Sequence, residues 1–428
     1  MGILKKVFNI SDGEHKPVVF SFLYFFFLMS SYFILRPVRD EMGIQAGVEN
    51  MQWLFTGTFI VMLLVVPAFG IVTKKVQRKK LISTIYVFFS LNILGFYFAF
   101  LLIDSTIIPV IFFIWLSVFN LFVVSIFWSF NSDIFTTNQA KRLYGPIAAG
   151  GSSGAIFGPA VTTFFINRIG LENLLLLSAF FLILSVIFVQ KLLKFGKSNE
   201  VNFERKLNGD IWNGVKLLVK NPLLRQIGIF ILLYTTISTF LYFEQAHIVS
   251  EVYSSAGDRT FYFGMRDLLV NVATLFIQFF LTGKVTRKWG ITFCLILVPG
   301  ISAFGFLSLG FTQSLYVLLI VQVIYRTLNH SIQRPAREVL FTSVTLEERY
   351  RSKNFIDTTL YRGGDAVSGW LFAGLSSVVV SLRTIALLTI PIALVWLMSG
   401  FRAGRLFTSK TIKFYGEIEK NRITKKSA

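Results

Sequence analysis

The chain has 428 residues, of which 54% are hydrophobic and 15% are charged. Soluble domains carry about 25% charged residues, so this composition excludes a soluble globular domain and indicates an all-α polytopic membrane protein. The formal net charge of +20 would indicate a nucleic-acid partner in a soluble protein. Here we assign it to cytoplasmic loops that face anionic lipid, and we expect no nucleic-acid partner.

A membrane-spanning helix needs about 20 mainly apolar residues, and twelve such segments follow one another along the chain. We predict spans near residues 17–35, 53–73, 81–103, 107–129, 145–166, 172–193, 225–246, 263–283, 291–311, 315–333, 358–380 and 383–403. The first segment is long for the apolar region of a signal peptide and lacks a small-residue cleavage site, so we expect it to remain as a span.

The basic residues predict the orientation of these spans. With the N-terminus in the cytoplasm, most of the 42 Lys and Arg residues fall in cytoplasmic segments, as the positive-inside rule requires. Outer segments hold only Arg36, Arg39, Arg168, Arg259 and Arg383, and the spans themselves hold Arg266, Arg326 and Arg362. Both termini are therefore predicted to be cytoplasmic, and we expect a multi-pass protein of a bacterial inner membrane.

The chain repeats a short pattern in its two halves. A glycine followed after three residues by two basic residues occurs at Gly70–Lys75, after the second span, and at Gly283–Lys288, after the eighth. Internal repeats of this kind are typical of secondary transporters. We predict an N-terminal six-helix half (1–193), a basic cytoplasmic linker (194–224), a C-terminal six-helix half (225–403) and a basic cytoplasmic tail (404–428).

Polar residues gather at the outer end of the first span. Tyr32, Arg36 and Arg39 share one helical face, which favours a substrate-binding role. The alternative is an interfacial charge cluster in which Asp40 and Glu41 neutralise the arginines.

Two segments of the N-terminal half resemble the major facilitator superfamily. The loop after the second span is similar to that family's G-x-x-x-D-R-x-G-R-R motif, with Lys74 in place of the acid and Gln77 in place of the second glycine. The fifth span is similar to the family's antiporter motif at Gly145, Gly154, Gly158 and Pro159, while Thr162 and Thr163 replace its last two glycines.

The glycines of the fifth span have a physical meaning of their own. Gly150, Gly154 and Gly158 recur every four residues, so they lie on one helical face. A stripe of small residues allows a second helix to approach closely, and we predict a helix-packing role for these three glycines.

Charges also occur in the seventh and eighth spans. Glu244 lies inside the seventh, and Arg266 precedes Asp267 near the outer start of the eighth. Adjacent opposite charges near an interface are common, so we interpret Arg266 and Asp267 as a structural pair.

The most unusual feature is a polar stripe within Leu315–Leu340. Gln322, Arg326, Asn329, Gln333 and Arg337 follow the spacing of one helical face. A charge near the middle of a span, such as Arg326, costs about 2.5–3.5 kcal/mol or more unless it faces protein or water. We therefore predict that the stripe lines a polar pathway. The alternative is a buried ion-pair network with acids on neighbouring helices.

The eleventh span carries a further patch. Thr358, Arg362, Asp365 and Gly369 share a face, and Asp365 is close enough in sequence to hold or neutralise Arg362. Tyr361 lies beside them. Arginines at different depths suit an anion with phosphate groups, because arginine makes two parallel hydrogen bonds to phosphate oxygens and stays charged when buried.

Three patches also resemble the bacterial and plastid-type ATP/ADP antiporter family, in particular its free-living bacterial branch. Their residues read I-L-R-P-V-R-D at Ile34–Asp40, F-W-S-F-N at Phe127–Asn131 with Q-A-K-R-L-Y at Gln139–Tyr144, and R-E-V-L-F at Arg337–Phe341 with N-F-I-D at Asn354–Asp357 and Y-R-G-G-D at Tyr361–Asp365. The resemblance implies nucleotide exchange, with Arg39 and Arg362 at positions where the family has lysines important for substrate. Gln139 replaces an acidic residue of the family motif.

The residues that enzymes and metal sites need are scarce. The chain has three His, one Cys and no H-E-x-x-H motif. Gly196-Lys197-Ser198 is similar to the end of a Walker A motif, but Lys191 occupies the position of its first glycine. We expect no enzyme activity, no metal and no cofactor.

These observations predict a monomeric secondary transporter of the major facilitator fold. Its substrate would be a small organic anion, either a nucleotide moved by ATP/ADP-type exchange or a phosphorylated metabolite. Substrate contacts are predicted for Arg36, Arg39, Arg326, Arg362, Gln322, Asn329, Gln333, Tyr32 and Tyr361, and gating or coupling for Asp40, Asp133, Glu244, Asp365 and Arg337. The alternatives are proton-coupled transport of another organic anion, and a non-transporting or lipid-handling protein of the same fold.

Overall fold

The computed structural model describes residues 11, 13–75, 78–195, 211–378 and 381–424. Gln77 of the loop motif, the Gly196–Ser198 tripeptide, residues 196–210 of the predicted linker and the end of the predicted tail (425–428) lie outside the described residues. Within the described ranges the chain is helical and contains no β-strand.

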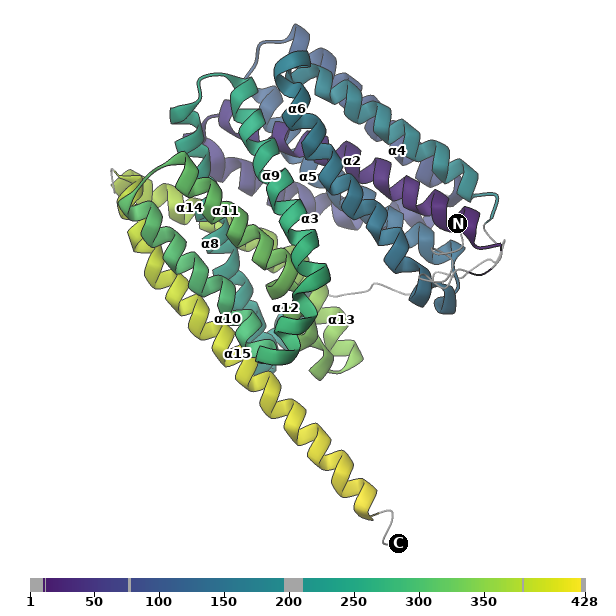
Figure 1. Ribbon diagram of the computed structural model, residues 1–428, viewed down its shortest axis with the longest axis vertical. Helices are drawn as coiled ribbons and strands as arrows, with labels where there is room; N and C mark the ends of the chain where they lie inside the picture. Colours follow the sequence, from purple (N-terminus) through teal and green to yellow (C-terminus); the bar gives the residue numbers. More distant parts are fainter. Residues whose placement is uncertain (1–10, 12, 76–77, 196–210, 379–380, 425–428) are drawn as a thin grey trace. The chain divides into compact units, whose positions relative to one another are not determined.

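The helices follow one another along the chain with short connections (Figure 1). The α-helices of the first part are α2 (His15–Gln45), α3 (Met51–Lys75), α4 (Arg78–Leu102), α5 (Ile107–Ile134) and α6 (Thr137–Leu192). Those of the second part are α7 (Ile211–Lys220), α8 (Pro222–Val252), α9 (Ala256–Phe280), α10 (Thr282–Phe311), α11 (Leu315–Leu328), α12 (Arg334–Leu340), α13 (Leu346–Phe355), α14 (Tyr361–Val378) and α15 (Leu382–Thr424).

Shorter helical turns complete the set. Two are 3₁₀-helices, η1 (Val48–Asn50) and η3 (Phe341–Ser343). Two are π-helices, η2 (Asn329–Gln333) between α11 and α12 and η4 (Ile356–Leu360) between α13 and α14. Both π-helices therefore interrupt the segments that carry the predicted polar patches.

Ten helices in the described part of the chain are long and apolar enough to cross a membrane. One of them, α6, is two helices joined at Gly170, whose φ of 82° and ψ of 167° are not helical. Gly170 separates the predicted fifth and sixth spans, and only glycine adopts such backbone angles without strain. The predicted eleventh span corresponds to η4 and α14 and is not among the ten. The polytopic all-α class is confirmed, and the number twelve stays a prediction.

The chain divides into two compact units. Unit 1 comprises the described residues of Met1–Glu204 and Val249–Val272, and unit 2 those of Arg205–Ile248 and Ala273–Ala428. The end of α8 and the first part of α9 thus pack with the helices of unit 1, although chain order alone assigns them to the predicted C-terminal half. The charged contacts described below supply a physical reason.

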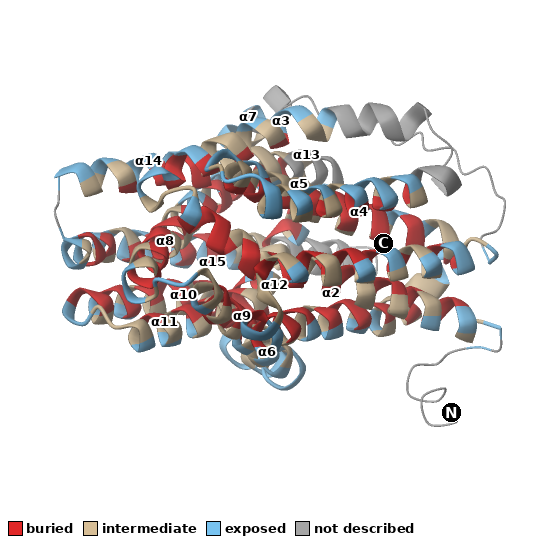
Figure 2. Ribbon diagram, turned by 90° about the horizontal axis from the view of Figure 1, so that it is seen from above, coloured by how far each residue is buried: buried red, intermediate tan, exposed pale blue. Residues whose placement is uncertain are grey.

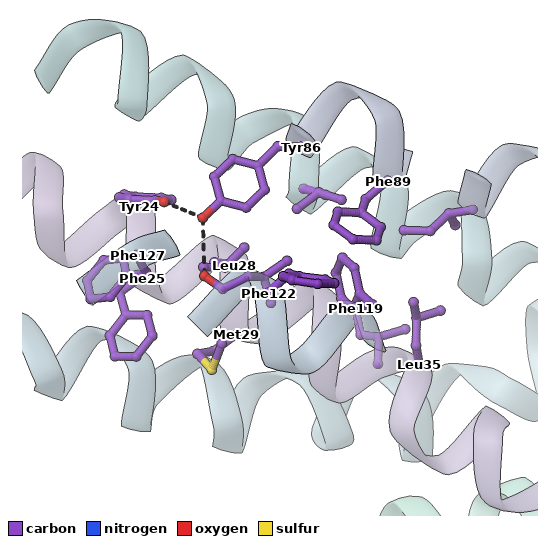
Figure 3. Packing of buried hydrophobic residues seen from close by; sticks show 14 of the residues in the cluster. Tyr24, Phe25, Leu28, Met29, Leu35, Tyr86, Phe89, Phe119, Phe122 and Phe127 are labelled. Carbon is purple, nitrogen blue, oxygen red and sulfur yellow. Dashed lines mark hydrogen bonds between the residues drawn. The ribbon is translucent and has the colours of Figure 1, made fainter. Parts of the chain in front are cut away.

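The interior of unit 1 is built from aromatic rings on α2, α4 and α5. Figure 3 shows Tyr24, Tyr86 and Phe127 side by side in this cluster. The hydroxyls of Tyr24 and Tyr86 are hydrogen-bonded to each other, and Tyr86 also donates to the backbone oxygen of Val123 at 3.2 Å. These bonds satisfy the two buried hydroxyls, so the aromatic core leaves neither of them without a partner.

Each long helix has a buried and an exposed apolar side (Figure 2). On α4, Tyr86 and Ile93 are fully buried, while Leu91 and Leu102 are 60% and 78% exposed. Large apolar side chains that are exposed along a whole helix face are expected in a multi-pass membrane protein. In the membrane these side chains contact lipid and not water.

The glycine stripe of α6 lies against the backbone of α2. A Cβ atom at Gly150 would lie 2.3 Å from the Phe22 carbonyl oxygen, and one at Gly154 would lie 2.4 Å from the Phe26 oxygen. At Gly158 it would meet the Phe33 Cβ at 2.7 Å. Contacts this short are possible only for glycine, so the stripe sets how closely the two helices approach.

Unit 2 contains a similar close crossing of α10 and α15, which run side by side in Figure 1. A Cβ at Gly404 of α15 would lie 2.7 Å from the Thr292 Cβ, and one at Gly400 would lie 3.1 Å from the Leu295 oxygen. The helix that α15 packs against, α10, bends at Gly290, where φ is 76°. The basic Gly283–Lys288 repeat therefore forms a short helical segment before the bend.

The start of α2 is fastened to the start of α6. Glu14 accepts hydrogen bonds from Gln139 Nε2 at 2.9 Å and from Arg142 Nη2 at 3.0 Å. Burial of the Glu14 carboxyl opposes its ionisation, but these bonds and one from the Ser11 backbone outweigh it and lower its pKa to about 2. Gln139, which replaces an acidic residue of the resembled motif, thus supports a carboxylate.

We expect Gly154→Ala to lower the stability of the protein by about 1–3 kcal/mol, because the new methyl group overlaps the α2 backbone. Gly145→Ala is the matched control, since it adds the same methyl group to α6 where no atom lies within 4 Å. The measurement is the midpoint of thermal unfolding in detergent. Equal midpoints for the two variants would contradict the packing described above.

Candidate functional site

Charged side chains from α2 and α9 meet inside unit 1. We call this group the α2–α9 charge cluster; its members are Arg36, Arg39, Asp40, Glu41, Arg259, Arg266 and Asp267. At its centre, Arg266 is 0% exposed, and its Nη2 atom lies 2.7 Å from both Asp40 Oδ2 and Asp267 Oδ1. The Arg266 Nε also donates to Asp267 Oδ1 at 3.0 Å. Such hydrogen-bonded pairing offsets the cost of burying the charge.

A second pair of the cluster fixes the start of α9. Arg259 donates from Nε and Nη2 to the two carboxylate oxygens of Glu41, each at 2.7 Å. Glu41 itself is fully buried and also accepts from Gln45 at 3.0 Å. Parallel hydrogen bonds of this kind are the strongest form of ion pair, so they hold the first turns of α9 against α2.

Arg36 and Arg39 differ from Arg266 because their tips are partly exposed. The Arg36 side chain is 21% exposed, and its Nε lies 3.4 Å from Asp267 Oδ2. The Arg39 side chain is 20% exposed, and its guanidinium lies 3.9 Å from the ring centroid of Phe113. Arg39 also lies 3.8 Å from Asp40 and donates to the Phe113 carbonyl oxygen at 3.3 Å. Both side chains are thus oriented while part of their surface stays exposed.

The sequence prediction for this region was incomplete. Arg266 and Asp267 were interpreted as a pair at a membrane interface, whereas the structure buries both and adds Asp40 to them. Arg259, which was assigned to an outer segment, is the partner of Glu41. The signal available in the sequence was the position of Arg266 inside a predicted span, where a charge requires a partner. Tyr32, also predicted here, is half-buried and packs against Phe33 and Phe119.

In unit 2 the polar stripe begins on α11. Gln322 is 1% exposed and donates from Nε2 to the Leu241 carbonyl oxygen of α8 at 3.0 Å. Its Oε1 accepts a hydrogen bond from Arg326 Nε at 2.8 Å. Gln322 therefore links the half-buried Arg326 to the backbone of α8.

Because of the π-helix η2, the residues of the polar stripe contact different helices. Asn329 Nδ2 donates to the Tyr234 hydroxyl of α8 at 3.1 Å, whereas Gln333 Nε2 donates to the Leu295 oxygen of α10 at 3.2 Å. Further along, Arg337 lies 3.7 Å from Asp357 of η4. A π-turn contains an extra residue, so residues after it do not continue the face that a regular α-helix would present.

The second π-helix leads directly into the patch on α14. Tyr361 donates from its hydroxyl to that of Tyr234 at 3.4 Å, and Arg362 lies 3.6 Å from Asp365. The side chain of Arg362 is 32% exposed and that of Asp365 is 12% exposed. Tyr361 and Asn329 thus come together at Tyr234, a residue that was not predicted from the sequence.

Asp133 and Glu244 are further predicted coupling residues. Asp133 is half-buried at the end of α5 in unit 1. Glu244 of α8 is 2% exposed, and its Oε1 atom has no hydrogen-bond partner among the described residues. A buried carboxyl oxygen without a partner is costly, which makes Glu244 a candidate for a functional group.

The chain is similar to known membrane transporters. The model of the Major Facilitator Superfamily matches residues 17–349. ADP,ATP carrier protein 2 of Chlamydia pneumoniae is 25% identical over 218 residues, which are 45% of this chain and 40% of the carrier. ADP,ATP carrier protein 3 of Rickettsia bellii (strain RML369-C) is 21% identical over 295 residues, which are 57% of this chain and 58% of the carrier. The similarity therefore spans less than two thirds of either carrier.

Solved structures of transporters have the same fold. The nucleoside transporter NupG matches with a TM-score of 0.66 and 12% identity, over 92% of this chain and 99% of NupG. A bacterial homologue of the human lysosomal transporter Spinster matches with a TM-score of 0.60 and 14% identity, over 94% and 99% of the two chains. At these identities the likeness shows the fold alone.

We expect Arg266→Met to destabilise the protein by about 3–5 kcal/mol, because it leaves Asp40 and Asp267 buried beside one another without their shared partner. Arg168→Met is the control, since Arg168 is an exposed arginine of unit 1. The measurement is again thermal unfolding in detergent. Adding Asp40→Asn to the Arg266→Met variant should recover part of the loss, and no recovery would argue against this role of the ion pair.

Proposed function

Because the chain belongs to the major facilitator superfamily, we propose that it is a secondary active transporter that moves a small organic anion by alternating access. The polytopic fold and the transporter structures that share it support this class. We further propose that it works as a monomer in a bacterial inner membrane, with both termini in the cytoplasm and with its two halves joined by the basic linker.

The observation that carries the anion proposal is the set of partly exposed arginine side chains on membrane helices. Arg36 and Arg39 belong to unit 1, and Arg326 and Arg362 belong to unit 2. Each is oriented by a neighbouring side chain or ring without being fully enclosed. Guanidinium groups that are oriented and partly open suit the oxygen atoms of phosphate or carboxylate.

We propose a nucleotide or a phosphorylated metabolite as the substrate, transported by exchange. The two curated relatives are named ADP,ATP carriers, and NupG is a nucleoside transporter. The names of these three proteins support a nucleotide as the substrate. Arginine also binds other phosphorylated compounds, so the experiment must include both groups.

We expect Arg326→Ala and Arg362→Ala each to reduce counterflow of the transported anion by about tenfold to a hundredfold, since a hydrogen bond to a charged group contributes about 1.5–3 kcal/mol. The measurement uses proteoliposomes with labelled ATP, ADP and a panel of phosphorylated metabolites. Arg383→Ala is the control, because Arg383 is an exposed arginine of unit 2.

Two results would count against this proposal. If both variants match Arg383→Ala for every transported anion, Arg326 and Arg362 do not bind substrate. If the wild-type protein exchanges no anion of the panel, the anion transport proposal itself is wrong.

Glu244 favours proton coupling as a second candidate function. Its carboxyl is buried in α8, and Oε1 has no hydrogen-bond partner among the described residues. A carboxyl in such a place is easily kept protonated, and it can then release its proton when the surroundings change. Proton coupling would use Glu244 as the carrier, with Asp365 and Asp133 as further candidates.

If transport is coupled to protons, Glu244→Gln should abolish uptake driven by a pH gradient and leave substrate counterflow largely intact. The amide resembles the protonated carboxyl but has no proton to release, whereas exchange of substrate requires no net proton movement. Glu251→Gln is the control, because Glu251 is an exposed carboxylate on the same helix. Gradient-driven uptake that persists in Glu244→Gln would exclude Glu244 as the carrier.

A further inference from the structure

Three helices of unit 2 bring two tyrosines and an asparagine into contact. We call Tyr234 of α8, Tyr361 of α14 and Asn329 of η2 the ring cluster. The hydroxyl of Tyr234 accepts hydrogen bonds from Asn329 Nδ2 at 3.1 Å and from Tyr361 at 3.4 Å. The ring centroids of Tyr234 and Tyr361 are 5.8 Å apart, and Trp396 lies 5.9 Å from Tyr234 on the other side.

The two tyrosine rings are oriented but not fully enclosed. Trp396, behind Tyr234, is completely buried, whereas Tyr234 and Tyr361 are both half-buried. Trp396 and the hydrogen bonds of the tyrosine hydroxyl hold the Tyr234 ring in place. Binding of a ligand against this ring therefore costs little side-chain entropy. Rings held in this way provide flat apolar surface, and Asn329 places an amide beside them.

Positive charge lies next to the same rings. The Arg362 guanidinium is 5.7 Å from the Tyr361 ring centroid. Arg326 precedes Asn329 by less than one helical turn and is held by Gln322. The ring cluster therefore has a flat apolar part, an amide and the adjacent Arg362 guanidinium, and Arg326 lies less than one helical turn before Asn329.

The backbone gives a second, independent observation. Asn329 is the first residue of the π-helix η2, and Tyr361 directly follows the π-helix η4. π-turns are rare, and they occur frequently at functional sites. Two of them adjoin the ring cluster, at Asn329 and at Tyr361, and a packing role for Tyr234 and Tyr361 alone does not require either.

We propose that the ring cluster is a subsite for a planar, hydrogen-bonding ring of the transported anion, while Arg326 and Arg362 bind its anionic group. The inference rests on the proposed anion transport and narrows the class of substrate. The substrate is then a phosphorylated compound with a heteroaromatic ring, as in a nucleotide, and not a phosphorylated sugar or a small inorganic anion.

The test compares two probes that share charge and differ in the ring. ATP and tripolyphosphate are used as competitors for a transported anion in proteoliposomes that contain the full chain. We expect Tyr361→Leu to weaken competition by ATP about tenfold, the typical loss when an aromatic side chain that stacks on a base is removed. Competition by tripolyphosphate should stay unchanged, while Arg362→Ala should weaken both probes.

Two further variants make the comparison specific. Tyr361→Phe keeps the ring and should restore most of the affinity for ATP. Tyr316→Leu is the control, because Tyr316 is 79% exposed at the start of α11. Should Tyr361→Leu fail to fold, Asn329→Ala gives the same comparison, since it removes the amide and leaves every ring in place.

The outcomes separate this inference from the proposed function. Equal weakening of ATP and tripolyphosphate by Tyr361→Leu and by Asn329→Ala would overturn the ring subsite and leave anion transport standing. A wild-type protein that recognises tripolyphosphate but not ATP would do the same. A wild-type protein that transports no anion and responds to neither probe would overturn the proposed function as well.

Discussion

An arginine on a membrane helix needs a polar or oppositely charged partner, or water, because hydrocarbon cannot solvate its charge. Much of the architecture around α2 and α9 follows from that constraint. Arg266 is enclosed by Asp40 and Asp267, and Arg259 is paired with the buried Glu41. These contacts join α9 to α2, and the segment Val249–Val272 accordingly packs with unit 1. Burial of the charges and the association of the helices therefore depend on each other.

The same constraint has a different solution for the arginines with open surface. Arg39 lies over the Phe113 ring, Arg326 is held by the Gln322 amide, and Arg362 has the buried Asp365 nearby. Carboxylates also lie close to two of these arginines, since Arg39 is 3.8 Å from Asp40 and Arg362 is 3.6 Å from Asp365. In our proposal these partly exposed groups bind the anion, whereas the enclosed Arg266 is a structural element. Burial and partner type thus distinguish the two roles more clearly than residue type does.

The two π-helices show how the backbone adapts to these side chains. A regular α-helix from α11 through α12 would keep Asn329, Gln333 and Arg337 on one face. The extra residue in η2 lets Asn329 contact Tyr234 of α8 while Gln333 contacts the Leu295 oxygen of α10. Side chains of the neighbouring segment support this irregular stretch, since Thr282 donates to the Ser331 carbonyl oxygen at 2.9 Å. A carbonyl that the π-turn moves out of the regular pattern thus gains a hydrogen-bond partner.

The sequence by itself determined the class of fold and the segments that form helices, because apolar length and the distribution of basic residues report directly on the membrane. It also singled out Gly154 and Arg326, since glycine spacing and a charge within a span are local signals. Only the tertiary structure decided that Arg266 is enclosed by Asp40, that Glu41 belongs to Arg259, and that Tyr234 connects Asn329 to Tyr361. These partners are far apart in the chain, and a π-turn changes the helical register without a clear mark in the sequence. Which side chains meet depends on how the helices cross, and no periodicity within one helix contains that information.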